Sequence, residues 1–500
     1  MPIVFENIPD GLAVPLFYAE LRGAQTPYSA TLKLMLVGHK NTTGGVAVAG
    51  NPYRLSGDEA ARLFGKGSML EAMYRKARMQ SLFVEIWGVA AAPDVDAIAS
   101  VGSFTIGAVP AANGNLQAWI AGYPVSAIVR TTDTTSGMAI KLRNAINAAT
   151  HLPVTASIDG VNPAKVNLTC KWKGATGNII NLEKSVYGVD NPVASVVTVA
   201  AMAGGLGNAS LSTALAGIEE EKFDVLAVGT QGNSEQVAEL DAYFDHDTGR
   251  WSPFKQTFGH AFLGFESSFS TVMTYGATLN CPHVTIMAMY NSPTPQWEWA
   301  AAVSARVTAN WAQPPKVSLP LHKIELSGII AARNPADYFS IEERQGLLTN
   351  GLSTHTVDAD GTVRIERLVT LYKFNKYGDP DQSWSNAGTM FQLMYLVRAF
   401  RTRITGKYAR AALTDRDTGI EGFVSPEQLR DELIAEYGFQ ESQGLVENTE
   451  IFAQALVVER NATEPDRVDA MARADLVNEL GIFALLVESN LSSNTIKQTA

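Results

Sequence analysis

An alternation of apolar strands and amphipathic helices, interrupted once and then resumed, constrains the fold of this chain more than any other feature. Its first part predicts a buried strand over 31–38, a helix over 58–80 and a second strand over 82–87. This order favours a parallel sheet. The alternation returns after the glycines at 204–207, so both parts are expected to build one α/β domain. The later elements are helices over 211–221, 234–244 and 300–311, and strands over 223–228, 254–264 and 283–289.

The interruption, residues 101–200, follows a different pattern. Short runs alternate between apolar and polar residues, which is typical of half-buried strands. Asn113-Gly114 is a hairpin signal between the first two runs. One helix is predicted from Ser136 to Ala149, with Ser136 as its cap. These residues therefore predict a small β-rich domain inserted into the α/β domain.

The chain beyond Pro314-Pro315 is less regular until a strand is expected over 362–372. Ser425-Pro426 is a strong helix start, because proline suits the first helical position. Two further strands are expected over 453–459 and 481–487. An earlier helix is predicted by apolar residues at helical spacing: Met390, Leu393, Met394, Val397, Phe400 and Ile404.

The expected fold class is therefore a multidomain α/β and α+β protein. An α/β central domain is interrupted by the β-rich insertion and followed by an α+β C-terminal domain, with extended arms at both termini. The expected boundaries are 1–24 for the N-terminal arm, 25–100 and 201–360 for the central domain, 101–200 for the insertion, 361–488 for the C-terminal domain, and 489–500 for the C-terminal tail.

The N-terminal arm is predicted from a short β-favouring run, Ile3, Val4 and Phe5, followed by turn and breaker residues. It lacks the basic and long apolar regions of a signal peptide. Twenty extended residues span roughly 66 Å, whereas a compact chain of this length has a radius of gyration of about 23 Å. The arm is thus long enough to reach another subunit.

Charge and cysteine content narrow the possible partners. The formal net charge is −11, which argues against broad electrostatic binding to nucleic acid or to an anionic membrane. No apolar run approaches the length of a membrane span, so no membrane insertion is expected. Cys170 and Cys281 make no disulfide framework, and reduced thiols in an intracellular product are expected.

Nucleotide-binding and hydrolase signatures are missing from the sequence. The glycines at 204–207 lie where a phosphate loop would lie, but they do not spell Gly-x-Gly-x-x-Gly, and a flexible re-entry into the domain is the better interpretation. Residues 65–68 lack the Walker spacing, and there is no Gly-x-Ser-x-Gly elbow. Trp297, Trp299 and Trp311 are expected to serve packing rather than ligand stacking.

Metal-binding patterns are equally weak. The seven histidines form no His-x-x-x-His pair. Asp245-His246-Asp247 precedes Thr-Gly and is interpreted as a solvated turn, and 358–361 as a β-turn that leads into the next strand. We therefore expect no catalytic, cofactor-binding or metal-binding residues and no enzyme activity.

Five basic residues form the one positive run of this acidic chain, within and just after the helix predicted near residue 400. Such a run is a candidate for an electrostatic contact with another subunit, and a solvated helix face is the alternative. The residues are Arg398, Arg401, Arg403, Lys407 and Arg410.

An ordered set of segments resembles contractile-tail sheath proteins of bacteriophages, particularly the Mu-like group, whose central fold is called subtilisin-like. The most specific segment is GTVRIERLVTLY at 361–372. Fold topology alone confers no chemistry, and no protease motif is present. The other segments that carry the resemblance are Phe5–Pro9, Val14–Glu20, Ala300–Val303, Pro314–Leu319, Arg344–Thr354, Arg401–Tyr408 and Leu456–Asn461.

The resemblance implies a structural subunit that polymerises as six-fold rings stacked helically around a tail tube. Contraction would drive the tube through the host envelope. The implied partners are further copies of this chain, the tail tube protein, and the baseplate and tail terminator proteins. The implied location is the virion tail, assembled in the host bacterial cytoplasm, with the insertion facing outward. The alternatives are the sheath of a related injection device such as an R-type bacteriocin and, with less support, a soluble α/β enzyme.

Strand addition supplies a mechanism for such polymerisation. Ile3, Val4 and Phe5, together with a segment beyond Val487, would add strands to an exposed sheet edge of a neighbouring copy. The acceptor edge is expected in the C-terminal domain, on the strands predicted over 453–459 and 481–487. Its candidate residues are Leu456, Val457, Val458, Ile482, Phe483 and Leu485.

Overall fold

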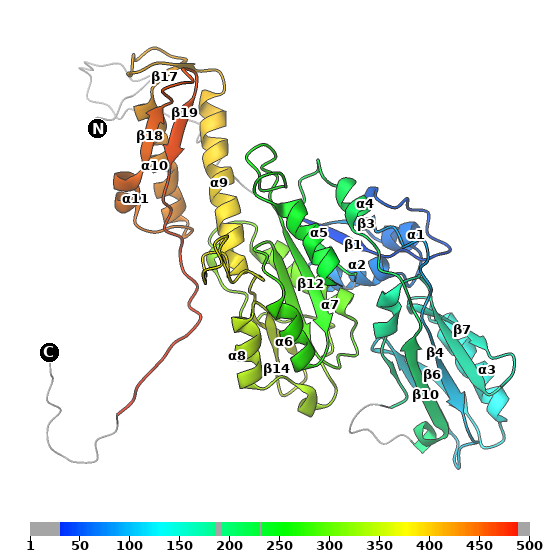
Figure 1. Ribbon diagram of the computed structural model, residues 1–500. Helices are drawn as coiled ribbons and strands as arrows, with labels where there is room; N and C mark the ends of the chain where they lie inside the picture. Colours follow the sequence, from blue (N-terminus) through cyan, green and yellow to red (C-terminus); the bar gives the residue numbers. More distant parts are fainter. Residues whose placement is uncertain (1–30, 186–191, 231, 489–500) are drawn as a thin grey trace, which may run out of the picture.

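The computed structural model shows three bodies in a row: a β-rich body at one end, a layered α/β body in the middle and a small helical body at the other end (Figure 1). The predicted arm with Ile3, Val4 and Phe5 and the predicted tail at 489–500 lie outside the described residues. The structure describes residues 31–185, 192–230 and 232–488.

A six-stranded sheet forms the middle body. Its central strand β1 pairs in parallel with β3 on one side and with β11 on the other, and β11, β12 and β13 continue in parallel. Only β2, at the edge, is antiparallel. The predicted parallel alternation is therefore confirmed. In sheet order the strands are β13 (Val284–Met289), β12 (His260–Glu266), β11 (Val225–Val228), β1 (Lys33–Gly38), β3 (Glu85–Ala90) and β2 (Pro52–Leu55).

Side chains of β1 alternate between two cores, as a strand buried on both faces requires. Leu34 and Leu36 pack into the core that contains residues of α2 and α7, whereas Met35 and Val37 pack into the core of the opposite face. The result is a three-layer sandwich. Helices α1 (Glu59–Phe64), α2 (Met69–Gln80) and α7 (Gln296–Asn310) belong to the first side, and α4 (Ser212–Ala216), α5 (Ser234–Phe244) and α6 (Phe269–Ala277) to the second.

The β-rich body consists of two antiparallel sheets, in the orders β10-β4-β8-β7 and β6-β5-β9, with helix α3 packed against strands of both. Met138, Leu142 and Ile146 form the buried face of α3, which confirms the helix predicted there. Its cap is Thr134, however, and Ser136 lies within the first turn. The elements are β4 (Val101–Ile106), β5 (Gly114–Ile120), β6 (Tyr123–Val129), α3 (Thr135–Ala148), β7 (Val154–Ile158), β8 (Lys165–Cys170), β9 (Leu182–Glu183) and β10 (Val197–Ala203).

The hairpin predicted at Asn113-Gly114 is wrong, because β4 and β5 belong to different sheets. The tight hairpin instead joins β5 to β6 through Ala121 and Gly122. Both residues have positive φ, 53° and 77°, the geometry of a turn whose twist matches that of the paired strands. Ala121 carries no sequence signal for that geometry.

The helical body is built on α9, which confirms the helix predicted from the apolar residues near 390–404. Ser425 caps α10 through a reciprocal capping box with Gln428, and Pro426 occupies the first turn, as predicted. The elements of this body are α9 (Ala387–Tyr408), β16 (Ala412–Leu413), β17 (Phe423–Val424), α10 (Pro426–Ser442), α11 (Thr449–Ala455), β18 (Val457–Arg460) and β19 (Val468–Met471). Helix α8 (Ile341–Thr349) and strands β14 (Thr354–Val357) and β15 (Val363–Arg367) belong to the middle body, where α8 contacts α6 and β14 contacts β13. Short 3-10 turns occupy Ala175–Ile179, Pro192–Val196, Lys316–Ser318 and Pro335–Asp337.

Three further elements differ in type or continuity from the predicted ones. The helix predicted over 58–80 divides into α1 and α2, because Gly65 and Gly67 take positive φ between them. The strand predicted over 453–459 begins as α11, whose sequence is rich in helix-forming residues, and only β18 is extended. The strand predicted over 481–487 is wrong for the single chain: the segment has no neighbouring strand with which to form a ladder.

None of the helices in the described part of the chain combines the length and the hydrophobicity that a membrane span requires.

Buried histidines make the stability of this fold sensitive to acid. Burial lowers the pKa of His39 and His355 to about 4 and that of His260 to about 3. The unfolded chain, with ordinary histidine pKa values of about 6.5, therefore takes up protons first. Burial also raises the pKa of Glu266 to about 8, which partly offsets this effect.

We predict that the free energy of unfolding is highest above pH 6.5 and falls by a few kcal/mol as the pH decreases from 7 to 5. Each histidine with a lowered pKa contributes a loss of up to about 1.4 kcal/mol per pH unit in this window. Chemical denaturation at pH 7, 6 and 5 measures the change. Equal or greater stability at pH 5 would contradict the prediction.

Candidate assembly surfaces

Side chains fill the position where an open parallel sheet usually binds a ligand, beside the carboxyl ends of the strands at the change in strand order. Here that position lies beyond β1 and β11. His39 follows β1 and stacks on Trp172 of the β-rich body, with ring centroids 6.4 Å apart. Trp172 meets Trp297 of α7 edge to face at 5.5 Å. Trp172 and Trp297 are each 1% exposed, so Trp297 serves packing, as predicted, and Trp172 packs against it.

The glycine-rich and aspartate-rich motifs of the sequence have structural roles. Gly205 and Asn178 exchange two hydrogen bonds, of 2.8 and 2.9 Å, so the glycines at 204–207 close the chain back onto the β-rich body. Asp245 Oδ1 accepts from the backbone N–H groups of Asp247 and Thr248, which confirms the turn predicted there. The β-turn predicted at 358–361 is also confirmed. The described residues contain no group of three or more potential metal ligands.

Some of the basic residues of α9 form ion pairs within the chain. Arg398 Nη1 lies 2.6 Å from Asp224 Oδ1, just before β11, and both side chains are largely buried. Its guanidinium also lies over the Phe258 ring, 5.5 Å from the centroid. Arg403 Nε lies 2.7 Å from Glu432 Oε2 of α10.

The same Glu432 carboxylate accepts from Lys407. Its pKa lies below the ordinary value because the hydrogen bonds from Lys407 and Arg403 outweigh its desolvation. Arg401 and Arg410 are exposed, and among the described residues neither has an ion-pair partner. Three of the five predicted contact residues therefore hold the chain together, and Arg401 and Arg410 remain at its surface.

Aromatic side chains complete the contact between α9 and the amino ends of strands β12 and β13. Trp384, just before α9, lies 6.5 Å from His283, and Phe391 lies 5.9 Å from His260. His283 in turn bonds His246 through the two Nε2 atoms at 2.9 Å. The helical body is thus joined to the sheet by one buried ion pair and an aromatic cluster. Neither group was identified from the sequence, because its members lie far apart along the chain.

The end of the described chain carries an exposed apolar segment. Leu480, Ile482, Phe483, Leu485, Leu486 and Val487 are 72–82% exposed, and residues 480–488 have no regular structure. In Figure 1 this segment leaves the helical body and runs free of it. A run of large apolar side chains without cover is typical of a surface that another protein covers.

The β18–β19 ribbon is the candidate edge for strand addition. It is a two-stranded antiparallel sheet, with β18 packed on α10. Val457 and Met471 are 45% and 52% exposed, whereas Leu456 is buried and its carbonyl accepts from Arg430 Nε. Leu456 is therefore already engaged within the chain. Val457 and Val458 lie in β18, and an isolated two-stranded ribbon is marginal without further contacts.

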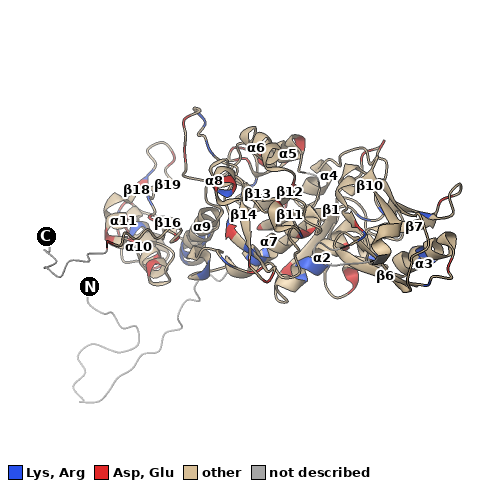
Figure 2. Cartoon of the chain, turned by 90° about the horizontal axis from the view of Figure 1, so that it is seen from below, with Lys and Arg blue, Asp and Glu red and all other residues tan. Residues whose placement is uncertain are grey.

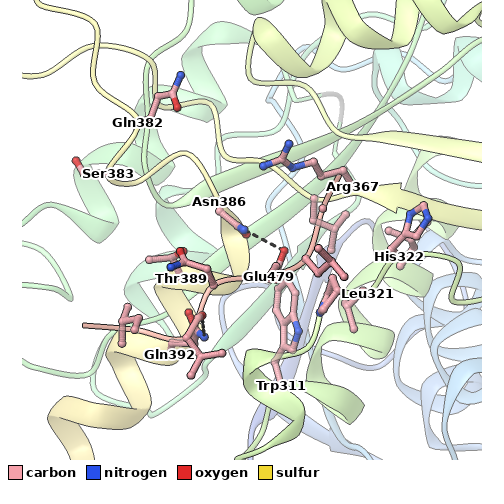
Figure 3. Close-up of a pocket in the computed structure, with 18 of the residues that line it drawn as sticks. Trp311, Leu321, His322, Arg367, Gln382, Ser383, Asn386, Thr389, Gln392 and Glu479 are labelled. Atoms are coloured by element: carbon pink, nitrogen blue, oxygen red, sulfur yellow. Dashed lines mark hydrogen bonds between the residues drawn. The ribbon is translucent and has the colours of Figure 1, made fainter. Parts of the chain in front are cut away.

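Acidic and basic segments are interspersed along all three bodies (Figure 2). Between the sheet and the helical body lies a pocket of about 460 Å³, whose wall includes residues 474–481 of the chain's own C-terminal segment. Asn386, Gln392 and Glu479 line it, with two hydrogen bonds between the segment and the start of α9 (Figure 3). Sequence reasoning missed this contact, which joins residues 85 to 93 positions apart.

Comparison with known proteins matches this chain to one protein family. Residues 204–371 match the phage tail sheath protein central domain, and residues 379–490 match the phage tail sheath C-terminal domain. The Mu-like prophage FluMu tail sheath protein of Haemophilus influenzae is 32% identical over 496 residues, which cover 98% of this chain and 99% of that protein.

Two solved sheath tail proteins are similar at lower identity. The protein from Desulfitobacterium hafniense is 12% identical, with a TM-score of 0.48, and the match covers 93% of this chain and 97% of that one. The protein from Listeria innocua is also 12% identical, with a TM-score of 0.47 and coverages of 90% and 96%.

Replacing Arg398 with alanine should lower the free energy of unfolding by about 3–5 kcal/mol, because the buried Asp224 carboxylate loses its partner. The matched control is Arg401→Ala on the same helix, which should change stability by about 0.5 kcal/mol or less, since Arg401 is exposed. Chemical denaturation of both variants measures the difference. Equal effects of the two substitutions would contradict a structural role of the Arg398–Asp224 pair.

Proposed function

Because this chain belongs to the phage tail sheath family, we propose that it polymerises as six-fold rings stacked helically around a tail tube. Contraction of this polymer drives the tube through the host envelope. The observation that carries the proposal is the match to a tail sheath protein over nearly the full length of both chains. The proposed location is the virion tail, with assembly in the host cytoplasm.

The contacts that hold copies together are proposed to be added strands. The segment 480–487 has the apolar, strand-like sequence that was expected of an acceptor, but it is a free extended segment in the single chain. We therefore propose that Ile482, Phe483 and Leu485 belong to a donor strand. The acceptor is the exposed edge of the β18–β19 ribbon of another copy, at Val457 and Val458, where backbone groups pair with an incoming strand.

The N-terminal residues Ile3, Val4 and Phe5 are proposed as the second donor. About five main-chain hydrogen bonds at about 1 kcal/mol each give roughly 5 kcal/mol per arm, before the entropic cost of ordering the arm. One arm alone is a weak contact. Within a lattice each arm acts at a high effective concentration, so a mesh of weak contacts holds while the rigid bodies move. The stored energy would then reside in the packing between bodies.

The β-rich body and the exposed arginines are given roles from their positions on the surface. The β-rich body lies at the opposite end of the molecule from the helical body and its free segment (Figure 1), which supports an outward position for the insertion. Arg401 and Arg410 remain candidates for an electrostatic contact with another subunit, because both are exposed. The tail tube, baseplate and tail terminator proteins are the other proposed partners.

Purified protein should form tubes or stacked rings, because copies that carry both donor strands and an acceptor edge are self-complementary. Negative-stain electron microscopy across a range of salt and protein concentrations measures this outcome. A strictly monomeric protein under all these conditions would count against the proposed function.

Deletion of residues 1–20 should leave a folded subunit that fails to form long sheaths, because the first described strand, β1, lies well beyond the deletion. Circular dichroism and thermal melting should match the full-length chain, which serves as the control for folding. Negative-stain images should show few or short tubes. Tubes of normal length would rule out a role of the N-terminal arm in polymerisation.

A further inference from the structure

The C-terminal segment divides sharply at Glu479. Upstream, residues 474–479 contact the helical body, and Leu476, Val477 and Glu479 are half-buried. Downstream, residues 480–488 are all exposed and make no hydrogen bond to any other described residue. The chain therefore has an anchored root that ends at Glu479 and a free arm that starts at Leu480.

Side chains from the start of α9 hold this root (Figure 3). Asn386, the N-cap of α9, accepts from the Gly388 N–H through Oδ1 at 2.8 Å and donates from Nδ2 to Glu479 Oε2 at 3.0 Å. Gln392 Nε2 donates to the Val477 carbonyl at 3.0 Å. A Cβ at Gly388 would lie 2.6 Å from Glu479 Oε1, so the carboxylate lies directly against the first turn of α9.

The backbone of the root is held from its other side. The Val477 N–H donates to the Leu445 carbonyl at 3.1 Å, and the Glu447 N–H donates to the Asp475 carbonyl at 2.9 Å. Leu476 forms an antiparallel bridge with Val446 between these two bonds. The root is thus a short strand-like segment fixed on two sides.

Asn386 is itself attached to the middle body. It forms an antiparallel bridge with Val369, which follows β15, and the Thr370 N–H donates to the Ser385 carbonyl at 2.9 Å. The Asn386 side chain therefore caps α9 and binds the arm root, while its backbone bridges to the middle body. Burial raises the pKa of Glu479, while the Asn386 hydrogen bond and the Arg367 charge lower it; the carboxylate is partly desolvated and depends on these partners.

We propose that Glu479 is the positioning residue of the C-terminal arm, fixing the point and direction in which residues 480–487 leave the subunit. The inference rests on the proposed function, in which this arm reaches another copy. Bending can then begin at Leu480 and Gly481, where a Cβ on the glycine would meet nothing within 4 Å. A fixed exit point raises the effective concentration of the arm at its acceptor.

The test uses the substitution Asn386→Asp in the unassembled full-length chain. This substitution keeps the helix cap at Gly388 but removes the hydrogen bond to Glu479. Aspartate caps helices as well as asparagine does, but it places a second carboxylate against Glu479. Hydrogen exchange at the Asp475 and Val477 amides should become about tenfold faster or more, because a hydrogen bond to a charged group contributes at least about 1.4 kcal/mol, a factor of ten. Exchange within α9 should stay unchanged.

The double variant Asn386→Asp with Glu479→Gln should restore slow exchange, because the glutamine amide donates to the new carboxylate. Glu488→Ala, an exposed acidic residue farther along the same segment, is the matched control and should leave exchange at Asp475 and Val477 unchanged. Unchanged exchange in Asn386→Asp, or no restoration in the double variant, would overturn the proposal.

Different measurements test the anchor at Glu479 and the proposed sheath function, so either can be refuted without the other. Exchange is measured on single subunits, whereas polymerisation is measured by negative stain. Restored exchange in a chain that never forms tubes would leave the anchor standing and remove the sheath function. The opposite outcome is also distinguishable. If the wild-type chain forms normal tubes but its Asp475 and Val477 amides exchange as fast as those of residues 481–488, the sheath function stands and the anchor is ruled out.

Discussion

The parallel pairing of β1 with both β3 and β11 is the constraint on which the rest of the subunit depends. It unites segments on either side of the β-rich insertion in one sheet, and it buries β1 on both faces. The two ends of the sheet then serve different purposes. Its carboxyl end is filled by Trp172 from the β-rich body, and its amino end carries Asp224, which pairs with Arg398 of α9. The elongated row of three bodies follows from these two attachments (Figure 1).

The second constraint is an apolar segment for which the described part of the chain provides neither burial nor a partner strand. Residues 480–487 expose large side chains and have no partner strand among the described residues. In the proposed assembly, the free strand-like segment of one copy pairs with the marginal two-stranded ribbon of another. In the proposed sheath these contacts are individually weak, and the lattice makes them strong through effective concentration. The anchor at Glu479 would make each contact directional without stiffening the arm itself.

Much of the fold was predictable because its signals are local. Periodicity located α5, α9 and the parallel strands, and Ser425-Pro426 marked the start of α10. Errors arose where the deciding interaction is distant. Asn113-Gly114 looked like a hairpin, but strand pairing placed the turn at Ala121, and the strand expected over 481–487 lacks a partner in the single chain. Of the candidate contact residues, Arg398 and Arg403 proved to have partners within the chain, because Asp224 and Glu432 are remote in sequence.

The central claim is that residues 480–487 become a strand on another copy. A cryo-electron microscopy map of the assembled polymer tests it most directly. The account predicts density for this segment in an extended conformation, hydrogen-bonded along β18 at Val457 and Val458 of a neighbouring copy. A map in which the segment folds back on its own chain, or contacts neighbours without backbone pairing, would contradict the account.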